Sequence, residues 1–388
     1  MEATPLRPIP SRLFAVLVFL TAGAPLSAQS IPDTAAAKID AVVAAEQARQ
    51  KIPGLALAVA FKDTLIYSKA YGSANLEHAV ATKPSTAFRT ASIAKPLTAT
   101  AVMVLVEAGK LNLDAPIRTY CQAWPEKHPV ITARQLLGHL AGVRHYVKRG
   151  ESSGKAHFFS IGDSLALFKD DALLHEPGSK YSYTTYGFSV LGCAIEGASG
   201  TTYETFMRDR VFAPAGMTRT RFDRIYEIIP DRAAGYQVLT KDVVATLPPA
   251  MREIAKPGEV YNADLHDTSM KVPGGGFVST AEDLVRFGIA LNAGRVLAKP
   301  TVEQMWTEQK TADGKGIGYG LGFGVFPAEE GIRRMSHGGN QAGASSFLVI
   351  LPEIGVTYAI MTNLEDGELG TISRGIANAM REAFMGKQ

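Results

Sequence analysis

Hydrophobic and polar positions near the start of the chain predict one helix and a pair of strands. Residues 33–47 are rich in alanine and repeat their apolar positions at helical spacing. Residues 54–60 and 64–71 have the composition of strands, with a turn at Lys62 and Asp63 between them. A helix followed by such a hairpin indicates the edge of an antiparallel sheet.

An almost continuous apolar segment, residues 92–108, predicts a buried helix, because a helix that is apolar on all sides has no face suited to water. Gly109 marks its end, as glycine commonly does at a helix C-terminus. From residue 111 to about 271 the pattern becomes a series of short helical segments separated by proline and glycine, including residues 132–140 and 186–196. This part of the chain is predicted to be a helical lobe.

The last part of the chain returns to mixed α/β patterns. Residues 280–292 have the amphipathic period of a helix. Two β-rich runs, residues 343–351 and 355–362, are separated by a proline-containing turn at residues 352–354 and predict a hairpin. Residues 369–384 then place isoleucine and methionine on one face, as expected of a helix that packs on the sheet.

Together these elements predict a mixed α/β (α+β) fold, with an antiparallel sheet flanked by helices and an inserted helical lobe. The chain has 388 residues, of which 46% are hydrophobic and 20% charged, so it is long enough for one large core or two modest ones. We expect the sheet lobe to comprise residues 29–110 and 271–388, and the helical lobe residues 111–270.

The charge balance argues against nucleic acid as a partner. The 40 basic and 37 acidic residues leave a formal net charge of +3, without a dense cluster of lysine and arginine. Such mild basicity indicates no particular partner.

The first residues have the pattern of a secretory signal. Arg7 and Arg12 precede the apolar run 13–20, and small residues dominate 21–28, at the end of which cleavage is expected. The apolar run is shorter than the roughly 20 residues that span a bilayer, so we expect no membrane span after removal of the signal. The mature protein, residues 29–388, is expected to be exported to the periplasm or secreted.

The two cysteines, Cys121 and Cys193, belong to no C-x-x-C pair or metal-type spacing. Export would permit a disulfide between them. The apolar string at residues 190–195 favours instead a thiol at Cys193 that packs as a small core residue.

An S-x-x-K motif, Ser92-Ile93-Ala94-Lys95, starts the predicted buried helix. Residues three apart share a helix face, so the Ser92 hydroxyl and the Lys95 amine can meet. A serine hydroxyl needs an adjacent base, and lysine serves only if its pKa falls towards about 7–8. A helix N-terminus within an apolar core lowers the lysine pKa by both burial and the helix dipole. A chance surface pattern is disfavoured, because an unpaired lysine at the head of an apolar helix is costly.

Two further segments hold polar groups suited to the same chemistry. Tyr183 lies in a polar turn before an apolar helix, and a tyrosine near a cation can pass a proton to a leaving group. Farther along, His337, Gly338, Gly339 and Asn340 precede a predicted strand. Adjacent glycines let a backbone approach a substrate, and a strand edge offers an N–H to a developing oxyanion. Taken alone, the first segment predicts a packing aromatic and the second a turn.

In this order the three pieces resemble the serine β-lactamase and penicillin-binding-protein family, whose motifs are S-x-x-K, Y-x-N and K-T-G or H-x-G. The resemblance covers nearly the whole mature chain and is greatest for the mitochondrial serine β-lactamase-like peptidase and its bacterial relatives. It implies a β-lactamase/transpeptidase-like fold, a serine hydrolase acting on a small-molecule or peptide substrate, and no cofactor or metal. Further familial stretches are residues 88–95, 107–111, 135–146 and 274–284.

The resemblance also implies a role for each motif. Ser92 would be the acylated nucleophile, Lys95 its base partner and Tyr183 the tyrosine that opens Y-x-N. The motif that begins at His337 falls where the family has K-T-G. The backbone N–H groups of Ser92 and Asn340 would then form the oxyanion hole.

Two departures from the family pattern bear on the substrate. Thr185 replaces the asparagine of Y-x-N, and His337 replaces the lysine of K-T-G, whose charge would meet a β-lactam carboxylate. We therefore expect hydrolysis of small peptide amides or carboxylic esters, with β-lactam hydrolysis as the alternative. A non-catalytic protein that binds cell-wall peptides or forms a scaffold is a third reading, although such a relative would be expected to lose Ser92 or Lys95.

Other short motifs are weaker. Residues 162–165 spell the G-D-S-L motif of another esterase family, but its D-x-x-H partner is missing, and a helix capped by Ser160 or Asp163 is the better prediction. His139 and His145 lack the companions of a metal site, so we expect them to be structural or to line the substrate pocket. The pocket walls are expected from loops 141–152 and 230–262.

Overall fold

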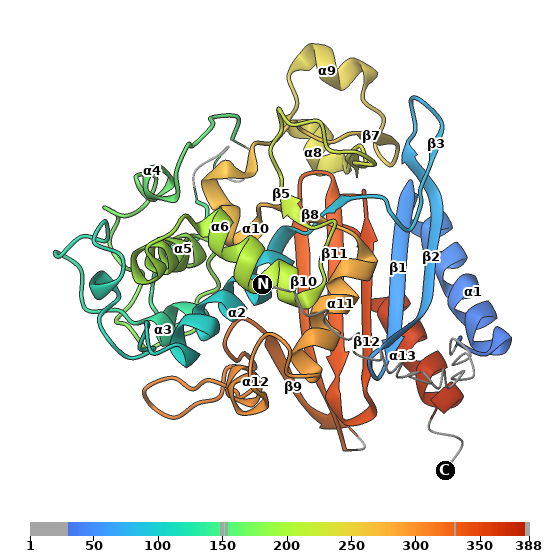
Figure 1. Ribbon diagram of the computed structural model, residues 1–388. Coiled ribbons are helices and arrows are strands. Elements are labelled where there is room, and N and C mark those ends of the chain that lie inside the picture. Colours follow the sequence, from blue (N-terminus) through green and yellow to red (C-terminus); the bar gives the residue numbers. More distant parts are fainter. Residues whose placement is uncertain (1–29, 148–150, 152–153, 330, 385–388) are drawn as a thin grey trace, which may run out of the picture.

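The computed structural model describes residues 30–147, 151, 154–329 and 331–384 (Figure 1). The predicted signal, residues 1–28, lies outside these ranges. Among the helices of the described ranges, none is both long enough and apolar enough to cross a membrane.

A seven-stranded antiparallel sheet forms the centre of the fold, as predicted. Its order is β3-β2-β1-β12-β11-β10-β9, so a strand from near the start of the chain pairs with the final strand. Leu55 lies opposite Thr362, and Phe61 opposite Val356. The strands are β1 (Gly54–Phe61), β2 (Thr64–Asn75), β3 (Val80–Ala81), β9 (Gly324–Glu329), β10 (Ile332–Gln341), β11 (Ala344–Leu351) and β12 (Val356–Thr362).

Helices cover both faces of this sheet (Figure 1). Helices α1 (Asp33–Gln50) and α13 (Gly370–Phe384) pack together on one face, and α11 (Ala281–Asn292) contacts β1 and β12 on the other. The leucine and valine side chains of β1 belong to the core under α1 and α13, whereas its alanines belong to the core on the α11 side. This alternation explains why β1 reads as continuously apolar. Gly288 keeps α11 close to the sheet, because a Cβ there would lie 2.5 Å from Thr357 Cγ2.

Most of the remaining helices lie at the end of the molecule away from α1 and α13 (Figure 1). Helix α2 (Ala94–Glu107) is buried from Ala94 to Leu105, as its apolar sequence predicts, and contacts α5 (Tyr186–Ser199). The other helices are α3 (Ala133–Leu137), α4 (Ile161–Leu165), α6 (Tyr203–Met207), α7 (Ala213–Ala215), α8 (Lys241–Thr246), α9 (Pro249–Ile254), α10 (Val272–Gly275) and α12 (Lys299–Met305). The short strands β4 (Phe88–Arg89), β8 (Phe277–Ser279) and β5 (Arg221–Phe222) form one small sheet, and β6 (Tyr236–Val238) and β7 (Val260–Asn262) form another.

The G-D-S-L segment belongs to a helix, as predicted. Ser160 caps α4 by accepting a hydrogen bond from Asp163 N at 3.0 Å, and the Asp163 side chain completes the capping box. Ser164 is buried and donates to the Ile161 carbonyl at 2.7 Å. Its hydroxyl therefore contributes to local structure.

The expectation of a free thiol at Cys193 was wrong, because Cys121 and Cys193 form a disulfide with Cα atoms 5.2 Å apart. The segment that carries Cys121 packs directly on α5. A Cβ at Gly197 of that helix would lie 1.8 Å from the Tyr120 carbonyl oxygen, so a glycine is required at this contact. The two cysteines are 72 positions apart, and only this packing brings them together.

The motif that begins at His337 lies inside strand β10 and does not form a turn before a strand. Residues from Met335 to Gln341 pair with β11, and His337 lies opposite Leu348. Two successive glycines disfavour a strand by propensity, so the strand was not visible in the local pattern. Its pairing with β11 and β9 overrides that local preference.

Candidate active site

Ser92 lies on a tight turn where the sheet meets the buried helix. It occupies a short 3₁₀ turn, Ala91–Ile93, that leads into α2. Ala91 has φ 45°, in the left-handed region that a residue with a side chain rarely adopts. Such backbone strain persists only where the surroundings hold it, and it is frequent at functional sites.

Strand β10 holds this turn from the other side. Gly339 lies so close that a Cβ on it would be 2.5 Å from the Thr90 carbonyl oxygen and 3.0 Å from Ala91 Cβ. Ser346 Oγ on β11 donates to the same Thr90 carbonyl at 2.7 Å. The absence of a side chain at Gly339 therefore lets the strand and the Ser92 turn meet.

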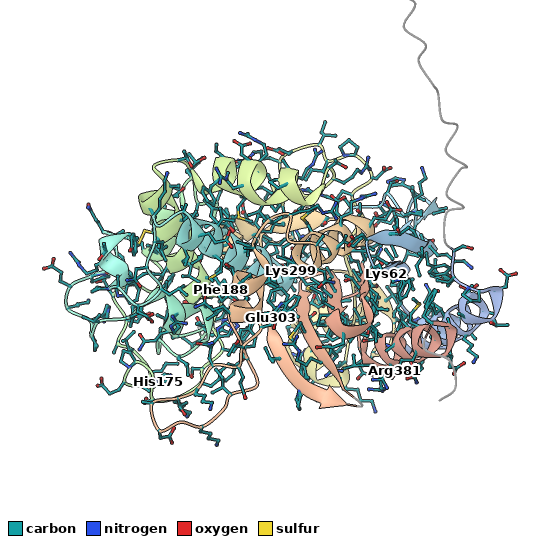
Figure 2. All side chains as sticks on the ribbon, turned by 60° about the horizontal axis from the view of Figure 1, so that its bottom comes forward. Lys62, His175, Phe188, Lys299, Glu303 and Arg381 are labelled. Atoms are coloured by element: carbon teal, nitrogen blue, oxygen red, sulfur yellow. A yellow bond between two sulfur atoms is a disulfide. The ribbon has the colours of Figure 1, made fainter. Side chains whose placement is uncertain are left out.

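Lys95 points at Ser92 from one turn farther along. Its Nζ lies 3.0 Å from Ser92 Oγ, as the S-x-x-K spacing predicts. The same atom lies 3.1 Å from Thr185 Oγ1 and 2.9 Å from the Gly274 carbonyl oxygen. The ring of Phe188 on α5, labelled in Figure 2, lies 5.6 Å from this nitrogen. The amine is thus enclosed by side chains and backbone from three parts of the chain.

The surroundings of Lys95 favour its neutral form. The residue is fully buried, and no carboxylate of the described residues forms an ion pair with it. Burial lowers the pKa of Lys95 well below its usual value, and the charge of Lys271 lowers it further. A carbonyl only accepts, so the amine donates to Gly274. A neutral amine can then donate its second N–H to Thr185 Oγ1 and accept the hydroxyl proton of Ser92 with its lone pair.

Tyr183 completes the group from the helical part of the chain. Its ring centroid lies 4.7 Å from Lys95 Nζ. Burial raises the pKa of the phenol, and a side-chain hydrogen bond with Ser92 opposes that rise. The tyrosine is therefore a neutral hydroxyl at physiological pH, next to both the serine and the amine.

Two histidines hold the backbone that follows Tyr183. Thr184 N donates to His139 Nδ1 at 3.1 Å, and Thr185 N donates to His145 Nδ1 at 3.2 Å. An imidazole nitrogen accepts such a bond only when it is unprotonated. Burial lowers the pKa of His145 to about 4 and that of His139 well below its usual value. The two rings thus position the polar turn in their neutral forms.

His337 is also neutral, although it stands where the family motif has a lysine. Its Nδ1 lies 2.7 Å from the Gly338 carbonyl oxygen, and its Nε2 lies 2.8 Å from Tyr319 Oη. Because the carbonyl only accepts, Nδ1 carries the hydrogen and Nε2 accepts from Tyr319. Burial lowers the pKa of His337 to about 3. The side chain supplies no fixed positive charge.

These groups open into a cavity of about 450 Å³. His145 and Tyr146 come from one of the two loops expected to form its walls, but no described residue of loop 230–262 lines it. Sequence reasoning missed Lys271 and Gln341, since neither belongs to a recognisable motif. The remaining lining residues are Ala91, Ser92, Tyr183, Thr185, Gly274, Gly275, Gly338, Gly339, Asn340, Ser346, Phe347, Gly367, Leu369 and Gly370.

The sheet flanked by helices, with a serine and a lysine at the head of the buried helix, is the architecture of the serine hydrolases that include β-lactamases and penicillin-binding proteins. The Beta-lactamase family model matches residues 39–379, and the chain belongs to this family.

Two relatives are 28% and 29% identical to this chain over the aligned residues. It is 29% identical to the serine beta-lactamase-like protein LACTB, mitochondrial, of Homo sapiens, over 78% of this chain and 69% of that protein. It is 28% identical to the putative penicillin-binding protein PbpX of Bacillus subtilis, over 68% of this chain and 60% of that protein.

Solved structures of low sequence identity share the fold. An octameric penicillin-binding protein homologue from Pyrococcus abyssi has a TM-score of 0.73 at 24% identity, covering 91% of this chain and 78% of the other. A D-amino acid amidase from Ochrobactrum anthropi SV3 also has a TM-score of 0.73, at 22% identity, covering 90% of this chain and 99% of the other.

Proposed function

We propose that this protein hydrolyses small peptide amides or carboxylic esters through an acyl-enzyme on Ser92. The observation that carries the proposal is the environment of the Lys95 amine. It is buried, it lacks a carboxylate partner among the described residues, and it lies 3.0 Å from Ser92 Oγ. A neutral amine in this position is a general base for the serine.

The reaction follows from these contacts in two halves. Ser92 Oγ attacks the substrate carbonyl while its proton passes to Lys95 Nζ, and the resulting oxyanion accepts from the backbone N–H groups of Ser92 and Asn340. The Lys95 ammonium returns a proton through the Tyr183 hydroxyl to the leaving amine or alcohol, and the acyl group remains on Ser92. Water then attacks the acyl-enzyme ester and gives one proton to the Lys95 amine. The ester bond to Ser92 breaks, Ser92 Oγ takes the proton from Lys95, and the carboxylic acid is released.

The two family motif positions occupied by His337 and Thr185 support amides and esters more strongly than β-lactams. His337 is neutral, so the fixed charge that would meet a β-lactam carboxylate at that position is absent. Thr185 is engaged by Lys95 at 3.1 Å and replaces the amide of the family motif with a hydroxyl. Both changes leave the groups needed for acyl transfer in place.

Covalent trapping tests the nucleophile. Incubation with a fluorophosphonate should add its mass to the wild-type protein at Ser92, and Ser92→Ala should remain unlabelled. Ser164→Ala, which alters the serine of the G-D-S-L segment, is the matched control and should label normally. Lys95→Met should slow labelling by about 10²–10⁴-fold, the range of a lost general base. Equal labelling of Ser92→Ala and wild type would remove the proposal.

A rate panel tests the substrate class. We expect short-chain p-nitrophenyl esters to turn over measurably and a chromogenic cephalosporin slowly, with short peptidyl amides in the same comparison. A cephalosporin rate far above the ester rates would favour β-lactam hydrolysis instead.

We also propose that the protein is exported and folds in an oxidising compartment. The N-terminal pattern of positive, apolar and small residues supports export, and the Cys121–Cys193 disulfide fits such a compartment. Cell fractionation tests this with two bacterial cultures, one that expresses the full chain and one that expresses the protein without residues 1–28. Retention of both forms in the cytoplasm would contradict it.

The cavity also supports the division into two lobes. His145, Tyr146, Tyr183 and Thr185 come from residues 111–270, and the other lining residues come from the two flanking segments. We propose that the helical lobe and the sheet lobe supply the two walls of the site.

A further inference from the structure

Gln341 is a buried amide without a partner at the end of strand β10. Its side chain is 8% exposed and lines the active-site cavity. Neither its Nε2 nor its Oε1 has a hydrogen-bond partner among the described residues. A buried amide left in this state costs free energy, so the position is suited to a ligand that supplies the missing partners.

Lys271 is a second polar group on the same cavity, with its Nζ 5.7 Å from the centroid of the Tyr146 ring. It is 4% exposed and lines the cavity, and in the described part of the chain no carboxylate pairs with its ammonium. The carboxylates that act on its charge from farther away are engaged elsewhere. Asp223 pairs with Arg89 at 2.8 Å, and Glu365 accepts from Gly343 N at 3.3 Å.

The two side chains converge on one point beside the reacting groups. A Cβ placed on Gly275 would lie 3.6 Å from Lys271 Cδ and Cε, and 3.7 Å from Gln341 Oε1. The residue before it, Gly274, holds Lys95 through its carbonyl oxygen. Lys271 and Gln341 therefore lie beside Gly275, the residue that follows Gly274, and Gly274 is a direct contact of the proposed base Lys95.

The charge of the cavity selects the class of group that fits there. Among the described residues that line it, none is an aspartate or glutamate, and Lys271 is the cationic side chain. Burial, with the charge of Arg89, lowers the pKa of Lys271 to about 7, so a bound anion would favour its ammonium form. A carboxylate satisfies both a buried ammonium and an amide N–H.

We propose that Lys271 and Gln341 form a subsite for a carboxylate group of the substrate, with the Lys271 ammonium and the Gln341 amide N–H groups as donors. The subsite deepens the proposed function, and its kinetic test rests on that function. It places the recognition of a negative charge at Lys271, before α10, and at Gln341, the last residue of β10, instead of at the family's lysine position where the neutral His337 stands.

The kinetic test compares an anionic and a neutral ester of similar length, mono-p-nitrophenyl glutarate and p-nitrophenyl pentanoate. In Lys271→Met, kcat/KM for the glutarate ester should fall by about tenfold or more, the loss expected for one charge-assisted hydrogen bond. The pentanoate value is the reference for effects common to both esters, because the charge of Lys271 also lowers the pKa of Lys95, and the glutarate-to-pentanoate ratio should fall by about tenfold or more. Lys110→Met, which removes an exposed lysine, should leave the ratio of the two values unchanged.

Gln341→Glu is the second variant, because it keeps the size of the side chain and adds a negative charge that would pair with Lys271. It should also lower the glutarate-to-pentanoate ratio by about tenfold or more. A ratio equal to wild type in both Lys271→Met and Gln341→Glu would overturn the subsite.

A binding measurement separates this proposal from the proposed function. Titration calorimetry of monomethyl glutarate with Ser92→Ala should show binding that is lost in Ser92→Ala/Lys271→Met. If no ester is hydrolysed but this difference persists, the hydrolase proposal fails and the subsite stands. If esters are hydrolysed but monomethyl glutarate binds both proteins equally, the subsite fails and the hydrolase proposal stands.

Discussion

Replacement of Gly339 by alanine tests whether the contact between strand β10 and the Ser92 turn sets the activity. The added methyl group would meet the Thr90 carbonyl oxygen at 2.5 Å and Ser346 Oγ at 2.4 Å, where ordinary contact begins at 3.4 Å. The serine hydroxyl can rotate away, but the carbonyl belongs to the backbone. To relieve that clash, the strand and the turn must move apart by about 0.9 Å (3.4 Å minus 2.5 Å).

A displacement of this size is large for a reacting group. Misplacement by about 1 Å can cost about 10²-fold in rate, so kcat/KM for a p-nitrophenyl ester and the rate of fluorophosphonate labelling should both fall by about that factor. Overpacking of this kind costs about 1–3 kcal/mol, so the free energy of unfolding in urea should fall as well.

The neighbouring Gly338→Ala is the control. A Cβ there would meet only the ring of Phe347, at 3.4 Å, so both activity and stability should remain near wild type. Gly339→Ala with a normal labelling rate would refute the reasoning, because the proposed oxyanion donors would then tolerate the shift. Equal losses in the two variants would show that glycine matters here for backbone freedom and not for close approach.

Three further outcomes follow from the contacts described. Replacing Cys121 and Cys193 by alanine should lower the free energy of unfolding by about 2–5 kcal/mol, and urea curves that match wild type would contradict the disulfide. Ester hydrolysis should rise with pH through the pKa of Lys95, because the neutral amine is the active form, and the acid limb should lie well below 10.5; a limb at 10.5 would indicate a solvated amine. Thr185→Val should leave a Lys95 N–H without an acceptor and lower kcat by about tenfold to a hundredfold, and an unchanged kcat would show that this bond is dispensable.

The pairing of Ser92 with Lys95 was predictable because it depends on local spacing along one helix. Thr185, by contrast, reaches Lys95 across 90 positions of sequence, and no periodicity encodes that contact. Only the resemblance to a known family placed Tyr183 and Thr185 near the serine. The same limit explains the disulfide, since the apolar surroundings of Cys193 gave no sign of the distant Cys121.

The main helices and strands were predictable because burial on one or both faces leaves a clear hydrophobic period. Strand β10 was hidden by its two glycines, whose absent side chains serve the contact with Ser92. Lys271 and Gln341 have the polarity of surface residues, and they are buried only because distant segments close over them. Residues of this kind are found from the three-dimensional arrangement and not from local pattern.

The pairing of β1 with β12 makes assembly of the sheet depend on synthesis of the final strand. As a ribosome or a translocation channel releases the polypeptide, β1 emerges early and must wait about 300 residues for one of its two neighbours. Until then β1 has an open edge, and β10 and β11 cannot join the hairpin β1–β2 in one sheet. A nascent chain that lacks β12 should therefore be without the proposed activity and a target for proteases.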